Sequence, residues 1–108
     1  MRFQDLLAYK KSFPKEERYS LTDQIRRSSR SVSANISEAY RKRIYPKNFI
    51  SKLTDSDAEN SETQTWLEYA LACKYIDSNT FEDFLKESEE IGKLINYMIN
   101  NPGKFGSK

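Results

Sequence analysis

Residues 21–39, LTDQIRRSSRSVSANISEA, decide the fold class of this chain. Their apolar members recur at intervals of three, four or seven residues, as Leu21, Ile25, Val32, Ile36 and Ala39. This spacing places all of them on one stripe of an α-helix. Neither proline nor glycine interrupts the run, which therefore predicts one long helix from about residue 20 to about residue 43.

Three more helices are predicted outward from this stretch. A short one covers about residues 2–12 and is ended by Pro14, and the other two cover about residues 46–76 and 80–100. Residues 101–108, which begin with Asn101, Pro102 and Gly103, read as a frayed tail. We expect one all-α domain, residues 1–108, folded as an up-and-down antiparallel four-helix bundle with a short first helix.

The middle of the third predicted helix is polar where a simple core would be apolar. Ser56, Asn60 and Thr63 occupy the inward stripe between Leu53 and Leu67. A polar group is costly to bury without a partner. These three side chains are therefore expected to hydrogen-bond one another, water or a partner.

Composition excludes several kinds of chemistry. The chain has no histidine and a single cysteine, Cys73, so the usual zinc sites and the histidine-dependent triads cannot form. No glycine-rich phosphate loop occurs either. We expect no enzyme activity, metal, cofactor or small-molecule substrate. No run reaches the ~18 apolar residues of a membrane span, and the N-terminus lacks a signal peptide, so no membrane association and a cytoplasmic location are expected.

Charge is distributed unevenly along the chain. The formal total is +2, but residues 18–52 carry +7 and residues 53–108 carry −6. The positive side chains of the second predicted helix and its end project away from the apolar stripe. They are Arg26, Arg27, Arg30, Arg41, Lys42, Arg43 and Lys47.

This basic surface suggests contact with nucleic acid. Such cations can bind successive phosphates, with an affinity that falls steeply as salt rises. Tyr40 and Tyr45 could add stacking on unpaired bases. We expect binding of RNA, or of DNA, through this surface. The alternative is that the charged face is only solvated, as the outer faces of helices usually are.

Three stretches of the sequence resemble a known family. They are FPKEERYSLTDQIRRS at residues 13–28, SVSANISEA at residues 31–39 and ETQ at residues 62–64. In them the chain resembles the four-helix-bundle proteins encoded in intervening sequences of 23S ribosomal RNA genes. The resemblance implies a pentameric barrel, no known catalysis and suspected contact with nucleic acid. A related branch looks like the accessory protein of diversity-generating retroelements, which binds nucleic acid through a basic surface.

The chain departs from the family pattern at its first helix. Members usually carry a full-length helix before the element FPxEE, whereas only about ten residues precede Phe13 here. Apolar surface on the second and fourth helices is then expected to be exposed or covered by a neighbouring subunit. A segment that precedes the given sequence is the alternative.

A second face of the third predicted helix is a candidate oligomer interface. It carries acids followed by aromatic residues, namely Asp55, Glu59, Glu62, Trp66, Tyr69 and Cys73. This face could dock on the basic surface of a neighbouring copy and consume part of it. The chain would then be a structural scaffold for assembly or protein interaction, with no role in binding nucleic acid.

Overall fold

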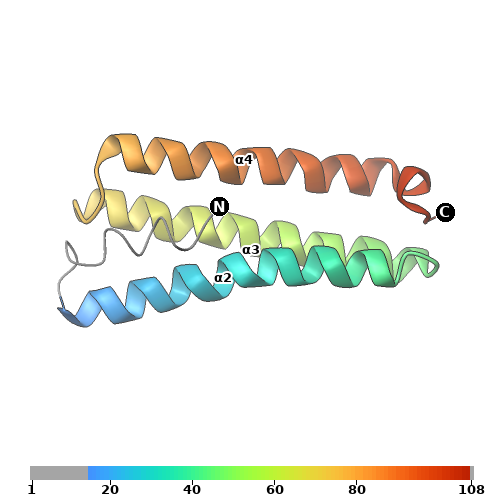
Figure 1. Ribbon diagram of the computed structural model, residues 1–108, viewed down its shortest axis with the longest axis horizontal. Coiled ribbons are helices and arrows are strands. Elements are labelled where there is room, and N and C mark those ends of the chain that lie inside the picture. The colour runs from blue at the N-terminus through green and yellow to red at the C-terminus, as the bar shows by residue number, and fades with distance from the viewer. Residues whose placement is uncertain (1–14, 108) are drawn as a thin grey trace.

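The computed structural model describes residues 15–107 of the chain and shows an all-α architecture there. Its elements are α2 (Lys15–Arg41), α3 (Pro46–Ala72), α4 (Ser78–Asn100) and the short 3-10 helix η2 (Pro102–Phe105), as seen in Figure 1. The prediction of an all-α fold is confirmed. The described residues contain three long helices and not four, because the predicted first helix, about residues 2–12, lies outside them.

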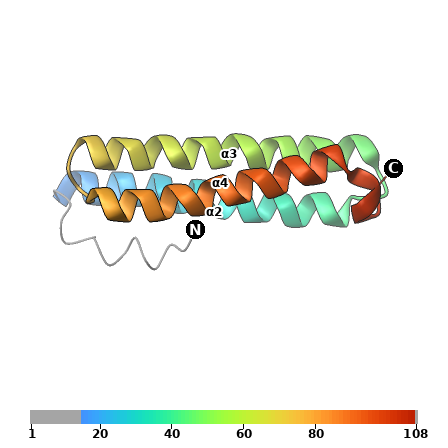
Figure 2. The same ribbon diagram turned by 90° about the horizontal axis from the view of Figure 1, so that it is seen from above.

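α3 runs antiparallel to both α2 and α4 along a molecule whose longest extent is 47 Å (Figure 1). α3 is the central helix and contacts both α2 and α4, as the two perpendicular views show (Figures 1 and 2). Each helix therefore packs on its neighbour in sequence, as in an up-and-down bundle. None of the described helices is long and apolar enough to span a membrane.

The end of α3 differs from the prediction because of the backbone conformation that follows it. α3 ends at Ala72, four residues before the predicted position, because Lys74 adopts a left-handed conformation with φ 61°. The amide of Tyr75 donates to the carbonyl of Ala70 at 2.8 Å, and the amide of Lys74 donates to Leu71 at 2.9 Å. These two bonds form a Schellman motif, which stops a helix by satisfying its last carbonyls.

The other ends shift by a few residues. α2 begins at Lys15, before the predicted start at residue 20, and ends at Arg41 rather than residue 43. α4 begins at Ser78 because the Asp77 side chain accepts a hydrogen bond from the Thr80 amide at 2.7 Å. Such an N-cap satisfies one of the free amides of the first turn.

The core consists of two apolar clusters at opposite ends of the bundle. The first cluster comprises Leu21, Ile25, Leu67, Ala70, Ile76, Phe81 and Phe84. The second cluster comprises Val32, Ala39, Phe49, Leu53, Ile95 and Met98. Both draw on α2, α3 and α4, so burial of apolar surface holds the three helices together at both ends.

Between the clusters lies a polar waist, made of Ser28, Ser56, Asn60, Thr63, Gln64 and Ser88. The Ser56 hydroxyl donates to the Val32 carbonyl at 2.7 Å, and Thr63 Oγ1 lies 2.8 Å from Ser28 Oγ. These bonds join α3 to α2, and the prediction that the polar stripe of α3 makes hydrogen bonds is confirmed.

On its other side the waist joins α3 to α4. The Asn60 amide donates to the Ser88 carbonyl and accepts from the Ser88 hydroxyl, both at 2.9 Å. Gln64 donates to the same hydroxyl at 2.9 Å. Gly92 of α4 lies close by, and a Cβ at this position would make an ordinary van der Waals contact with Asn60 Nδ2 at 3.4 Å. The waist thus pairs its polar groups across both helix interfaces.

The chain after α4 packs on the bundle, so the prediction of a frayed tail is wrong for residues 101–107. The ring of Phe105 in η2 contacts the second cluster and lies 5.9 Å, edge to face, from that of Tyr97. Ser107 is buried. Burial of the Phe105 side chain therefore holds this segment against the bundle, although most of its residues are polar or small. η2 lies at the end of the bundle where α2 joins α3 (Figure 1).

Candidate nucleic-acid interface

The structure divides the seven predicted basic residues into two groups. The helical group, Arg26, Arg27 and Arg30, lies in the middle of α2. The turn group, Arg41, Lys42, Arg43 and Lys47, lies where α2 ends and α3 begins. Arg30 and Arg41 are separated by about 16 Å along the helix axis, at 1.5 Å per residue. The predicted continuous basic surface is therefore two separate patches.

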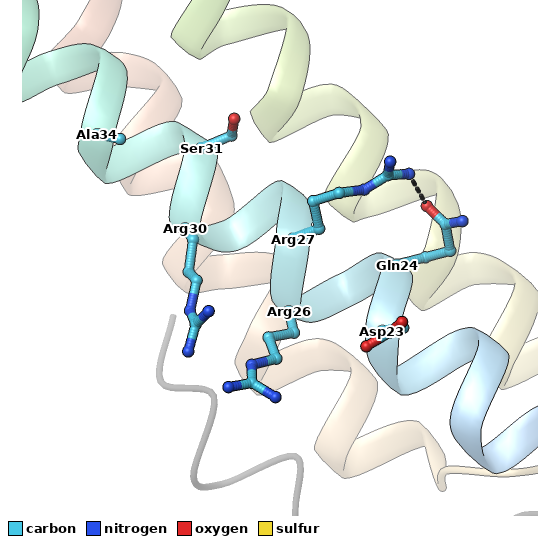
Figure 3. Close-up of a pocket in the computed structure, with 7 residues that line it drawn as sticks. All are labelled: Asp23, Gln24, Arg26, Arg27, Arg30, Ser31 and Ala34. Atoms are coloured by element: carbon cyan, nitrogen blue, oxygen red, sulfur yellow. Dashed lines mark hydrogen bonds between the residues drawn. The ribbon is translucent and has the colours of Figure 1, made fainter.

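The helical group points in two directions. Arg26 and Arg30 extend on one side of α2, whereas Arg27 extends on the other side, toward α3, and donates a hydrogen bond to Gln24 (Figure 3). These side chains line a surface hollow, and its described lining comes from α2 alone. The hollow is an open surface and not an enclosed pocket.

The Arg27 side chain lies at the interface between α2 and α3. The pKa of the Glu59 carboxyl on α3 is raised above its ordinary value, first by partial burial and then by the charge of Glu62 and a hydrogen bond with it. The positive charge of Arg27 acts in the opposite direction and lowers this pKa. Arg27 therefore lies near an acidic pair of its own chain, and part of its charge is compensated there.

The turn group lies in a stretch without any acid. Residues 40–47, YRKRIYPK, contain four cations and no Asp or Glu. Arg41, Lys42 and Lys47 are exposed. Lys42 has one acidic neighbour, Glu38, at 3.7 Å across an exposed pair, which stabilises little and leaves the ammonium hydrated. Three exposed cations thus form a compact positive patch.

The start of α3 adds to the positive potential at this turn. Pro46 is its first residue, and neither a side-chain cap nor an acid of the first turn lies at this end. The amino end of a helix carries a partial positive charge from its aligned peptide dipoles. It adds to the charge of Lys47 at the start of α3, whereas Arg41 lies at the carboxyl end of α2, which carries the opposite partial charge.

Arg43 has a structural role within the turn group. Its guanidinium donates to the Tyr40 carbonyl at 2.9 Å and lies 4.3 Å from the centre of the Tyr40 ring. Its side chain also contacts the C-terminal segment, where a Cβ on Gly106 would lie only 2.9 Å from Arg43 Cδ. Arg43 therefore packs between the turn and the C-terminal segment. The exposed positive charge of the turn comes mainly from Arg41, Lys42 and Lys47.

Ile44 is a residue of this site that the sequence prediction missed. It exposes 70% of its surface, next to Tyr45, which exposes 57%. The only sequence signal is an apolar residue outside every helical stripe, at a turn that is otherwise basic. The site therefore combines cations with exposed apolar side chains.

The predicted oligomer interface lies along one side of α3 and reaches its C-cap, and Asp55, Tyr69 and Cys73 are exposed while its other three residues are partly exposed. We call Asp55, Glu59, Glu62, Trp66, Tyr69 and Cys73 the acid–aromatic face. Within it, Trp66 Nε1 donates to Glu62 at 3.3 Å, and the Trp66 and Tyr69 rings meet edge to face at 6.5 Å. Trp66 also packs against the first cluster. This aromatic residue therefore serves the core of its own chain as well as the surface.

Within residues 15–107, no group of three or more Cys, Asp or Glu side chains is placed to hold a metal ion. The geometry describes an elongated all-α bundle with exposed cations on α2 and at the turn between α2 and α3. A family model described as 23S rRNA-intervening sequence protein matches residues 3–97. The chain belongs to this family.

A solved structure supports the same assignment. The chain is similar to a protein with unknown function from the S23 ribosomal protein family of Bacteroides thetaiotaomicron VPI-5482. The two are 32% identical, the match covers 91% of this chain and 88% of the other, and the TM-score is 0.79. No curated protein matches the chain.

Proposed function

We propose that this protein is a non-catalytic binding protein that contacts nucleic acid, RNA in particular, through the turn group. One observation carries the proposal, namely the gathering of Arg41, Lys42 and Lys47 on an exposed turn that has no acid between residues 40 and 47. Release of counterions from neutralised phosphates is the main source of affinity at such a patch. The helical group contributes less, because Arg27 is compensated by its own chain.

The test is a titration of labelled RNA across a salt series from about 50 to 200 mM. Wild-type protein should bind at low salt and lose affinity steeply as salt rises. The double variant Arg41→Glu with Lys47→Glu should bind far more weakly, and its dependence of log affinity on log salt should shrink by about 1.4, since two phosphate contacts are lost.

The control is Lys86→Glu with Lys93→Glu, which changes the net charge equally on α4. Both lysines are exposed. Binding should stay close to wild type if the location of the charge matters. Absence of binding at low salt, or equal losses in both double variants, would contradict the proposal.

A purely structural scaffold is the second candidate function, and the acid–aromatic face is the observation that favours it. Its exposed Asp55 and partly exposed Glu62 could meet Arg26 and Arg30 of a neighbouring copy. The ring of five that the resemblance implies would use such head-to-tail contacts. Light scattering tests this assembly, since Arg26→Glu with Arg30→Glu should dissociate it, whereas a wild-type monomer would contradict it.

A further inference from the structure

We propose that Ile44 and Tyr45 form a stacking platform for unpaired bases, so that the ligand of the turn group is single-stranded nucleic acid. This inference rests on the proposed function and narrows its ligand class. It is based on the exposure of Ile44 and Tyr45, which binding of phosphates by the cations does not require.

Exposed apolar surface is concentrated at this turn. Among the residues whose exposure the structure describes, six large apolar side chains are exposed, and three of them, Tyr40, Ile44 and Tyr45, lie within six residues. Ile44 is the most exposed of the six, at 70%. Single exposed apolar residues are normal, but a cluster on an otherwise charged surface is typical of a binding site.

The two tyrosines of the turn differ in availability. The Tyr40 ring already makes a cation–π contact with the Arg43 guanidinium, which lies 4.3 Å from the ring centre. The Tyr45 backbone is held at both ends, since its amide donates to the Lys42 carbonyl and its carbonyl accepts from the Phe49 amide, both at 2.9 Å. Tyr45 thus presents an exposed ring on a fixed backbone, and little conformational entropy should be lost when a base stacks on it.

The surrounding charges fit a strand whose bases are accessible. Lys42 and Lys47 flank Ile44 and Tyr45 in sequence and are exposed. In this arrangement the cations neutralise phosphates while the aromatic ring meets the face of a base, the usual combination in proteins that bind single strands. Bases of a duplex are stacked on one another, so their faces are not available to Tyr45.

A membrane surface is the other ligand class that attracts aromatic and basic residues. Binding in the plane of a membrane needs a long amphipathic face with many apolar contacts. The turn offers only three such side chains, Tyr40, Ile44 and Tyr45, and Arg43 lies over the Tyr40 ring. The observations therefore favour nucleic acid, and anionic vesicles become a control.

The experiment compares an oligouridylate of about 12 nucleotides, which has little structure of its own, with an RNA duplex of the same length. Wild-type protein should prefer the single strand. Tyr45→Ala should weaken binding of the single strand roughly tenfold, a typical loss for one stacked base, and leave duplex binding unchanged. Tyr45→Phe should restore it, because the ring remains.

Ile44→Ser has a matched control in Leu94→Ser, since Leu94 is an exposed aliphatic residue too but lies on α4. Only Ile44→Ser should weaken binding of the oligouridylate. Equal melting temperatures of these variants and wild type would exclude an effect through unfolding.

The outcomes separate this inference from the proposed function. If neither ligand binds at low salt, the proposed function fails and this inference fails with it. If Arg41→Glu with Lys47→Glu weakens binding of both ligands while Tyr45→Ala has no effect, the turn binds phosphates only and the stacking platform is refuted. If Tyr45→Ala weakens binding to anionic vesicles but not to the oligouridylate, the platform serves a membrane and the inference is overturned.

Discussion

The helical group and the turn group carry similar numbers of positive charges, but their surroundings differ. Arg27 of the helical group lies near the acidic pair of α3, and Gln24 accepts one of its hydrogen bonds. The turn group follows a helix end and has exposed apolar neighbours, Ile44 and Tyr45. Two groups with a similar number of cations can therefore differ in how well they bind an anionic ligand, since residues packed around a cation compensate part of its charge.

The largest expected effect is a difference between charge reversals in the two groups. Arg41→Glu with Lys47→Glu should lower RNA affinity about 100-fold at low salt, whereas Arg26→Glu with Arg30→Glu should lower it less than about tenfold. Both double variants change the net charge by the same amount, and fluorescence anisotropy measures both. Equal losses would show that the whole length of α2 contacts RNA and would remove the distinction between the groups.

A change in the polar waist should destabilise the whole bundle and therefore affect the helical group and the turn group to the same extent. Asn60→Ala removes two hydrogen bonds of a buried side chain, takes away the acceptor of the Ser88 hydroxyl and leaves a cavity, so the free energy of unfolding should fall by about 3 kcal/mol. Urea denaturation measures this loss. Asn96→Ala, the same substitution on the exposed side of α4, should cost less than about 0.5 kcal/mol. Similar losses in both variants would mean that the waist contributes no special stability.

A change at the C-terminal segment should loosen the turn group more than the helical group. Gly106 has φ 85°, and a Cβ there would lie 2.9 Å from Arg43 Cδ. Gly106→Ala should therefore destabilise the protein by about 1–2 kcal/mol and increase hydrogen exchange of the turn amides. Gly103→Ala is the control, because no atom lies within 4 Å of its added Cβ. Unchanged exchange at the turn in Gly106→Ala would show that Arg43 does not depend on this contact.

The smallest expected effect concerns the acidic neighbours of the helical group. Because the pKa of Glu59 is raised in the folded state, the folded chain binds this proton more tightly, and stability should fall as the pH rises from the ordinary pKa of 4.5 through the raised value. Glu59→Gln should remove this dependence and stabilise the protein at neutral pH by less than about 0.5 kcal/mol.

Thermal unfolding at several pH values tests this effect. Glu68→Gln, on the exposed surface of the same helix, is the matched control for the loss of one negative charge. A loss of stability in Glu59→Gln at neutral pH would show that the attraction of Arg27 outweighs burial and the repulsion by Glu62.

The helices were largely predictable because their apolar spacing is a local property. Leu21, Ile25, Val32 and Ala39 are buried as their period requires. The end of α3 was not predictable, because Lys74 takes up a left-handed conformation that glycine usually provides. The position of Phe105 was missed for a different reason, since its partners in the second cluster come from other parts of the chain.

The candidate site shows the same division. The all-α class, the polar stripe of α3 and the basic character of residues 40–47 follow from residue types at fixed spacing and were predictable without the structure. Packing between helices brings Arg27 near Glu59 and Arg43 near the segment of Gly106, and it leaves Ile44 exposed. The physical reason is that the availability of a side chain depends on neighbours brought close by packing, and its own stretch of sequence does not encode them.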